Sequence, residues 1–256
     1  MRPLPALMVA PNGATKTKAD HPALPMTIPE LVACATACHA AGADGLHAHV
    51  RDAAGRHVLD AGLYAELLAE LSQQVPQMQV QITTEAVGRY SPAQQRALVE
   101  TLRPAAVSIA LREITAEPDS AVTRRFFAFC EAAEIAVQHI LYDSADVARF
   151  GALRAEGILP DTPAPQVLHV LGRYATGQRS VPTDLDAPLR AQAKLGFDPD
   201  WAICAFGPEE SVCLLAAHRA GGKVRIGFEN NLFAANGDLA ADNVAQVAAY
   251  LRLLAD

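Results

Sequence analysis

Short apolar segments rich in β-branched residues alternate with longer segments of helical periodicity along the whole chain. A short apolar run bounded by polar or turn residues is typical of a buried strand, whereas apolar positions that recur every three or four residues indicate a helix. This pattern predicts eight strands, near residues 6–10, 44–49, 78–84, 105–110, 135–141, 166–171, 201–205 and 224–228.

The segments between these strands carry helix start signals. Thr27 precedes Pro29, Ser91 precedes Pro92, and Pro208 precedes two acidic residues. Proline is tolerated in a first helical turn, and an acid there interacts favourably with the positive end of the helix dipole. Eight strand–helix units in 256 residues, with no Ser/Gly-rich linker, predict an α/β fold of one domain, a TIM (β/α)8 barrel over residues 1–256.

The amino-acid composition restricts the possible binding partners of the protein and its cellular compartment. The net charge of −7 argues against a general nucleic-acid surface, which depends on clustered Lys and Arg. The first apolar run is too short for a signal peptide, and no stretch is long and apolar enough to span a bilayer, so we expect a cytoplasmic protein without a membrane partner. The five cysteines lie in apolar segments without C-x-x-C pairing, and we expect core thiols.

Two polar clusters follow apolar runs that are far apart in sequence. His47 and His49 end the second predicted strand, and Glu229 follows the eighth. Alternate residues of a strand share a face, and the carboxyl ends of all barrel strands meet at one rim. Two imidazoles and one carboxylate leave coordination positions open, which suits zinc used as a Lewis acid and also accommodates iron or manganese. We therefore predict one divalent ion on these three residues.

Other polar residues reach the same rim. Taken alone, each is more typical of loop solvation or helix capping, and their convergence is what indicates a site. They are Asn12, Thr83, Thr84, Glu85, Ser108, Arg112, Glu113, Tyr142 and Asp143.

Four motifs together resemble the β-keto acid cleavage enzyme family, and the resemblance runs nearly end to end. The motifs are Pro11-Asn12-Gly13-Ala14-Thr15-Lys16, His21-Pro22-Ala23-Leu24-Pro25, the run from His47 to Asp52, and Arg225-Ile226-Gly227-Phe228-Glu229-Asn230-Asn231. The resemblance implies a zinc-dependent TIM barrel that uses acetyl-CoA to cleave a β-keto acid into acetoacetate and a new acyl-CoA. It also implies a homo-oligomer, a tetramer by analogy.

The resemblance assigns roles to individual residues. His47, His49 and Glu229 match the zinc ligands, and Arg225 matches the catalytic arginine. The predicted substrate-binding residues are Thr83 and Ser108, which match hydroxyl positions of the family, and Asn12 and Arg112 on the same rim.

The chain departs from the family at Asn230, where the family has an aspartate that holds the arginine. An asparagine can hydrogen-bond to Arg225 but supplies no negative charge. We predict that Glu85 or Glu113 provides the missing carboxylate, and all three residues are candidate catalytic positions beside Arg225.

A second departure concerns the CoA phosphates. Phosphate often binds at a helix start after the seventh or eighth strand of such barrels. Here Pro208 lacks an N–H, and Glu209 and Glu210 would repel an anion. We predict instead that Arg173 and Arg179, in the loop after the sixth strand, bind CoA; the further candidates are Arg89 and Arg112.

Two alternative functions remain open. A metal-dependent hydrolase of the amidohydrolase type also has an H-x-H motif, and His139 and His169 lie near the strands that carry its further ligands. Against it, such enzymes have the motif on the first strand and an aspartate after the eighth. The second alternative is a catalytically impaired paralogue that binds keto acid or acyl-CoA, suggested by Asn230.

Overall fold

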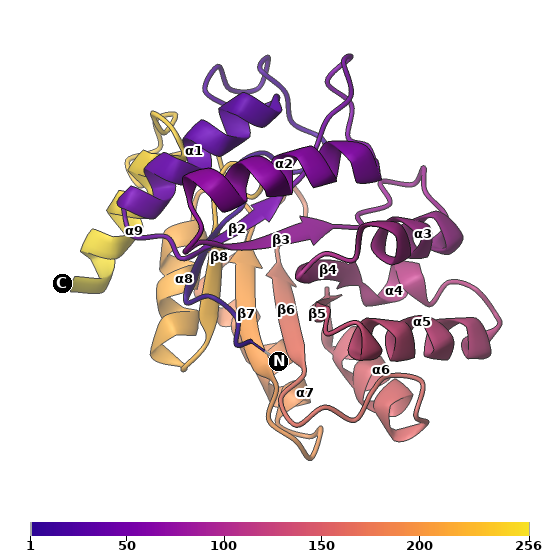
Figure 1. Cartoon of the computed structure of the whole chain (residues 1–256). Helices are drawn as coiled ribbons and strands as arrows, with labels where there is room; N and C mark the ends of the chain where they lie inside the picture. The colour runs from indigo at the N-terminus through magenta and orange to yellow at the C-terminus, as the bar shows by residue number, and fades with distance from the viewer. Residues whose placement is uncertain (1, 256) are drawn as a thin grey trace.

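Eight parallel strands close into a barrel in which each strand pairs with the next in sequence and β8 pairs with β1 (Figure 1). This arrangement comes from a computed structural model that describes residues 2–255. The strands are β1 Leu7–Val9, β2 Gly45–Ala48, β3 Gln79–Thr83, β4 Ala106–Ala110, β5 Ala136–Leu141, β6 Gln166–Leu171, β7 Asp200–Ala205 and β8 Lys223–Ile226. All eight predicted strands are present, and the TIM-barrel prediction is confirmed.

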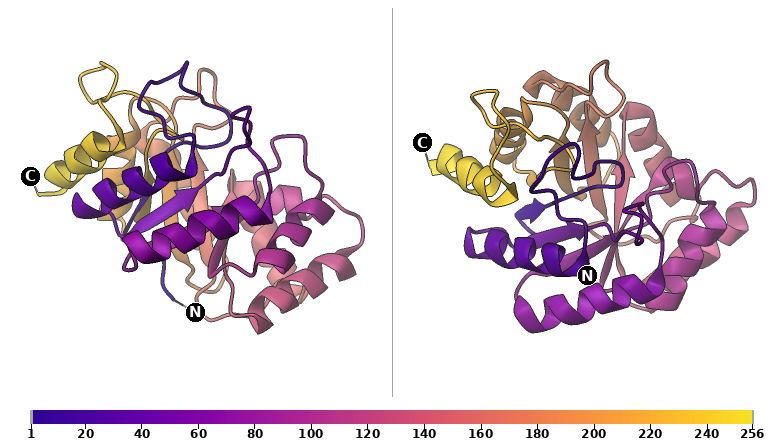
Figure 2. Two further views of the ribbon diagram at one scale, coloured as in Figure 1. Left: turned by 45° about the horizontal axis from the view of Figure 1, so that its top comes forward. Right: turned by 90° about the horizontal axis from the view of Figure 1, so that it is seen from above.

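Helices surround the strands, as the view down onto the barrel shows (Figure 2). They are α1 Ile28–Ala40, α2 Ala61–Gln74, α3 Pro92–Leu102, α4 Leu111–Ile114, α5 Ser120–Ala132, α6 Ser144–Ala155, α7 Asp186–Gln192, α8 Glu210–Arg219 and α9 Asn243–Ala255, with a 3-10 turn η1 at Pro182–Leu185. Thr27 and Ser91 form capping boxes at the starts of α1 and α3, as predicted. Helix α8 begins two residues beyond Pro208, because the chain first turns through a hydrogen bond from Glu210 N to Gly207 O.

Because successive side chains of a strand point to opposite faces, the buried side chains of the barrel form two layers, one facing the helices and one facing the barrel interior. Side chains that point outward pack against the helices in one large cluster. Side chains that point inward fall into two halves, of which the half formed by β4 to β7 is apolar; its members include Ala110, Ile140, Leu168, Val170, Ala202 and Cys204. The other half carries the polar side chains of His47, Gln81 and Arg225, and Gln138 on β5 accepts a hydrogen bond from Gln81 across the interior. Buried polar groups are costly unless they are hydrogen-bonded, so this half of the interior is where a function is expected.

The longest loops follow β1, β2, β6 and β8 and gather at the end of the barrel where the strand arrows point (Figure 1). All five cysteines are free, four of them buried and Cys34 half-buried. Within residues 2–255, no helix has the length and the apolar character needed to cross a bilayer.

Candidate active site

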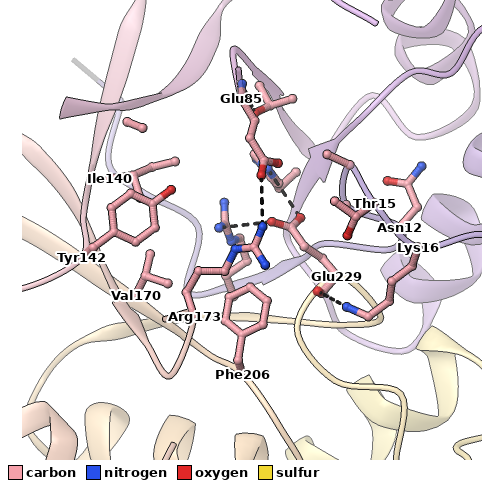
Figure 3. A pocket seen from close by; sticks show the side chains of 16 residues that line it. Asn12, Thr15, Lys16, Glu85, Ile140, Tyr142, Val170, Arg173, Phe206 and Glu229 are labelled. Atoms are coloured by element: carbon pink, nitrogen blue, oxygen red, sulfur yellow. Dashed lines mark hydrogen bonds and ion pairs between the residues drawn. The ribbon is translucent and has the colours of Figure 1, made fainter. Parts of the chain in front are cut away.

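A pocket opens among these loops at the C-terminal end of the strands (Figure 3). Its lining has two characters. One wall is formed by apolar and aromatic side chains, Ala110, Ile140, Tyr142, Val170 and Phe206. The opposite side carries polar and charged groups, among them Asn12, Thr15, Lys16 and Glu229, and Glu85 and Arg173 also line the pocket. The pocket can therefore hold a ligand with one apolar and one anionic part.

His47, His49 and Glu229 lie together at this pocket, although 180 residues separate the second histidine from the glutamate. Their potential ligand atoms lie within 4.8 Å of one another. Nε2 of His47 is 3.1 Å from Nε2 of His49, and Oε2 of Glu229 is 3.4 Å from Nε2 of His49 and 3.6 Å from Nε2 of His47. The strand alternation that aligns the histidines and the closure of the barrel that brings in Glu229 produce the predicted cluster.

The donor atoms fit a divalent cation. Oε2 of Glu229 is buried without a hydrogen-bond partner among the described residues. Burial, together with the charge of Arg225, lowers the pKa of His47 well below its ordinary value. Burial acts to raise the pKa of Glu229, but Arg225 and the two histidines outweigh it and hold this pKa well below its usual range. Neutral imidazole and ionised carboxylate are the forms that bind metals.

A chain of hydrogen bonds across the barrel interior sets the tautomer of His47. Nε2 of Gln138 donates to the carbonyl oxygen of Val167 over 3.3 Å, and Nε2 of Gln81 donates to Oε1 of Gln138 over 3.1 Å. Because a carbonyl only accepts, each amide is oriented in turn, and Oε1 of Gln81 faces Nδ1 of His47 at 2.9 Å. Nδ1 must therefore carry the proton, which leaves the Nε2 lone pair for a metal.

Arg225 lies on β8 beside the cluster and is almost fully buried. Its Nη2 is 3.5 Å from Oε1 of Glu229 and 3.6 Å from the sulfur of Cys204, whereas Nε and Nη1 have no partner among the described residues. Burial acts to lower the pKa of Arg225, but the charge of Glu229 outweighs it and the pKa is raised. The guanidinium thus stays charged with unused donors, an arrangement suited to an anionic ligand.

Lys16 was not among the predicted site residues, yet it lines the pocket. Its Nζ donates to the main-chain oxygen of Glu229 over 2.5 Å, and the ammonium lies 5.9 Å from the centre of the Phe206 ring. Burial lowers the pKa of this lysine. Gly13 lets the loop approach, because a Cβ there would lie 2.7 Å from Cγ of Glu229. The signal for Lys16 was its place in the Pro11–Lys16 motif.

The two glutamates predicted to replace the missing carboxylate have different surroundings. Glu85 lines the pocket, with Oε2 3.8 Å from Nδ1 of His49 and Oε1 3.7 Å from Nη2 of Arg173. Glu113 instead accepts hydrogen bonds from Ala86 N at 3.0 Å and from Nε2 of Gln95 at 2.8 Å. Among the described residues Arg225 pairs only with Glu229, so neither Glu85 nor Glu113 pairs with this guanidinium, and Glu85 lies instead beside the proposed metal ligand His49.

The predicted substrate-binding residues also differ in whether they line the pocket. Thr83 and Asn12 line the pocket; Oγ1 of Thr83 accepts from Glu85 N at 3.0 Å, and Nδ2 of Asn12 donates to the carbonyl oxygens of Pro25 and His49 at 3.1 and 3.0 Å. Ser108 is the strand neighbour of Thr83, and its buried hydroxyl has no partner among residues 2–255.

Arg112 lies outside the pocket lining. It forms ion pairs with Asp143 and Asp146, at 2.9 and 2.7 Å, and its guanidinium stacks 4.7 Å from the centre of the Tyr142 ring. Two carboxylates thus already balance the charge of Arg112, and its contact with substrate stays a prediction.

The arginines predicted to bind CoA also differ. Arg173 lines the pocket over Phe206, whereas Arg179 is exposed on the same loop. Arg89 donates to the carbonyl oxygen of His57 at 3.2 Å.

Asn230 does not contact the guanidinium of Arg225. Its Nδ2 is 3.4 Å from the main-chain oxygen of Arg225 and 3.4 Å from Oε1 of Glu210. Glu210 was expected to repel an anion at the start of α8. Instead it is fully buried, because its side chain turns inward to the loop after β8.

His139 and His169 point away from the pocket, on the helix-facing side of the strands. The ring of His139 packs between Phe127 and Phe150, and Nε2 of His169 bonds to Oε1 of Gln192 at 2.8 Å. The hydrolase alternative therefore lacks the further ligands that it requires.

A TIM barrel with ionisable groups converging at the C-terminal ends of its strands defines a (β/α)8-barrel enzyme. The chain belongs to the beta-keto acid cleavage enzyme family, which matches residues 6–256. Over 252 residues it is 24% identical to a 3-oxoadipate:acetyl-CoA acetyltransferase of Cupriavidus necator, with 94% of this chain and 85% of the relative covered. It is 22% identical to a 3-keto-5-aminohexanoate cleavage enzyme of Fusobacterium nucleatum subsp. nucleatum, with 94% and 88% covered.

Solved structures share the fold. The apo structure of ObcA superposes with a TM-score of 0.71 at 16% identity, covering 91% of this chain and 62% of that one. Its binary complex with oxaloacetate gives 0.73 at 15% identity, covering 91% and 64%. The chain thus spans less than two thirds of the length of ObcA. The family and its curated relatives make this protein an enzyme of β-keto acid cleavage and acyl transfer.

Proposed function

We propose that this enzyme condenses a β-keto acid with acetyl-CoA and cleaves the product to acetoacetate and a new acyl-CoA, with zinc held by His47, His49 and Glu229. The observation that carries the proposal is the convergence of these three ligands and the buried Arg225 on one pocket. The curated relatives support it, since one is named as an acetyl-CoA acetyltransferase and the other as a keto acid cleavage enzyme.

In this proposal, the residues around the metal site have separate roles in binding and stabilising the substrate anion. A bound zinc ion would supply Lewis-acid stabilisation of the negative charge that develops on the keto acid. Arg225 offers its unpartnered N–H groups to the same anion, and Glu229 holds the guanidinium in place through Nη2. Lys16 fixes the loop of Glu229 through its main-chain oxygen.

The remaining pocket residues position the two substrates. Thr83 and Asn12 offer a hydroxyl and an amide to the pocket, and Ser108, the strand neighbour of Thr83 on β4, offers a buried hydroxyl. The wall of Ile140, Val170 and Phe206 excludes water from the carbon chain of the keto acid. Arg173, at the pocket edge, and the exposed Arg179 are proposed to contact the CoA phosphates, because phosphate is bound well by guanidinium groups. We further propose a cytoplasmic homo-oligomer, a tetramer by analogy with the family.

The test combines metal analysis with turnover. Purified wild type should carry one zinc per chain and form acyl-CoA from acetyl-CoA with at least one member of a panel of β-keto acids. His49→Ala should lose both properties. His39→Ala, in α1 and bonded to Ala43 O at 2.9 Å, is the control and should keep both.

Three results would contradict the proposal. Equal, stoichiometric zinc in wild type and His49→Ala would place the metal elsewhere. Hydrolysis of an amide or ester without CoA would favour the hydrolase, and tight keto acid binding without turnover of any member of the panel would favour the binding-only paralogue.

A further inference from the structure

Glu210 is a fully buried carboxyl group that forms no ion pair within residues 2–255. Its partners are all N–H donors: Gly227 N at 3.1 Å, Nδ2 of Asn230 at 3.4 Å and Nδ2 of Asn231 at 3.5 Å. Burial raises the pKa of Glu210 to about 8, against the effect of these donors. A buried acid without a counter-ion is costly for stability, so its presence at the base of the active-site loop indicates a role there.

The donors around Glu210 set the orientation of Asn230. The main-chain oxygen of Arg225 can only accept, so Asn230 turns its Nδ2 toward it, and the same nitrogen donates to Oε1 of Glu210. Asn231 reinforces this geometry because Phe233 holds both ends of its amide, at 2.7 and 3.0 Å. Oδ1 of Asn230 is consequently left as a buried acceptor with no partner among the described residues.

Asn230, which carries this free acceptor, directly follows Glu229 in the chain. Arg225, on the preceding strand, has two buried guanidinium nitrogens without a partner among the described residues. An aspartate at this position would present a carboxylate oxygen in either orientation of its side chain. An asparagine presents Oδ1 only when its Nδ2 is bonded on the other side. Glu210 accepts a hydrogen bond from Nδ2 and so fixes this orientation.

We propose that Glu210 is a positioning residue and that Glu210 and Asn230 form one acid–amide unit. Glu210 contributes the carboxyl group and orients Asn230, so that Oδ1 of Asn230 is the free acceptor in the loop that follows Arg225. The carboxyl that position 230 lacks is thus on α8, and not on Glu85 or Glu113. The effect on turnover rests on the proposed function, whereas the pairing itself does not.

A charge-exchange cycle tests the unit, using Glu210→Gln, Asn230→Asp and the double variant in the zinc-loaded protein. Glu210→Gln should lower kcat roughly tenfold at unchanged zinc stoichiometry and unchanged KM, within the range of coupling between contacting residues. Asn230→Asp brings two acids together and should lower both kcat and Tm. The double variant restores an acid facing an amide, so its kcat should exceed that of Asn230→Asp by about tenfold. Glu209→Gln changes the exposed neighbouring acid and should behave as wild type.

The outcomes separate a positioning role from a purely structural one. If the effects on kcat simply multiply in the double variant, or if coupling appears in Tm but not in kcat, the proposal is overturned. If no protein of the set turns over any β-keto acid, the proposed function fails, and zinc affinity becomes the readout of the pairing. Recovery of affinity in the double variant would then support the unit, and multiplying losses would refute it.

Discussion

Gln81 accepts a hydrogen bond from Nδ1 of His47 over 2.9 Å, on the inside of the barrel. The pairing follows from the strand register, in which these two residues are direct neighbours on β2 and β3. Gln192 makes a similar contact with Nε2 of His169 over 2.8 Å, but on the helix-facing side of β6. Residues 2–255 therefore contain two buried glutamine–histidine pairs, of which only the first includes a proposed metal ligand.

This difference supplies a matched test of the ligand set. Gln81→Leu removes the acceptor that keeps the proton of His47 on Nδ1, and we expect zinc affinity to fall about tenfold to a hundredfold, as for other partners of metal-bound histidines. Gln192→Leu should leave the affinity unchanged. Competition with a chromogenic chelator measures both. Equal affinities in the two variants would show that the hydrogen-bond chain does not act on the metal.

Arg225 is expected to act on the substrate and not on the metal. Arg225→Met keeps much of the volume but removes the free N–H donors, so kcat should fall roughly a hundredfold or more, the usual cost of losing a donor to a developing anion. Zinc content should stay at one per chain. Steady-state kinetics and metal analysis on the same preparation give both values, and retained turnover would remove Arg225 from the mechanism.

Recognition of acetyl-CoA is expected to depend on the loop after β6. Arg173→Gln should raise the KM for acetyl-CoA about tenfold, the loss of one charge-assisted contact of about 1.5 kcal/mol. Arg179→Gln should have a smaller effect, because that side chain is exposed. Arg124→Gln, whose guanidinium bonds to Gly157 O at 2.9 Å on the outside of the barrel, is the control. An unchanged KM in both loop variants would place the CoA phosphates elsewhere.

The start of α1 should contribute a pH-dependent increment of stability. Burial acts to raise the pKa of Glu30, but bonds from Lys18 and from the main-chain N–H groups of Met26 and Thr27 outweigh it and lower the pKa to about 2. A depressed folded-state pKa stabilises above the unfolded value of about 4.5, and this stabilisation is lost as the pH falls toward 2.

Glu30→Gln should therefore melt roughly 2 °C below wild type at pH 7, and the difference should shrink between pH 4.5 and pH 3. Glu66→Gln, an exposed acid on α2, is the control and should show no such trend. Calorimetry at pH 7, 4.5 and 3 measures the difference in Tm between the variant and wild type. A difference that widens as the pH falls would contradict the lowered pKa of Glu30.

Patterns within short stretches of the sequence determined the strands, the helix starts and the pairing of the two histidines. The alternation of short apolar runs with helical periodicity predicted all eight strands, because a parallel strand buried on both faces has to be apolar over a short length. The His47-Ala48-His49 spacing predicted a shared face for the histidines, and the capping residues Thr27 and Ser91 marked helix starts through contacts within four residues. Barrel closure then predicted the meeting of these histidines with Glu229.

The remaining features were decided by contacts between residues far apart in sequence. Whether Glu113 or Arg112 faced the pocket depended on which donors and carboxylates the neighbouring helices placed beside them, namely Gln95 and Asp146. The inward turn of Glu210 depended on the loop after β8, and the approach of Lys16 to Glu229 spans 213 residues. A polar side chain at a strand end has several partners within reach, and only the packed barrel determines which of them it meets.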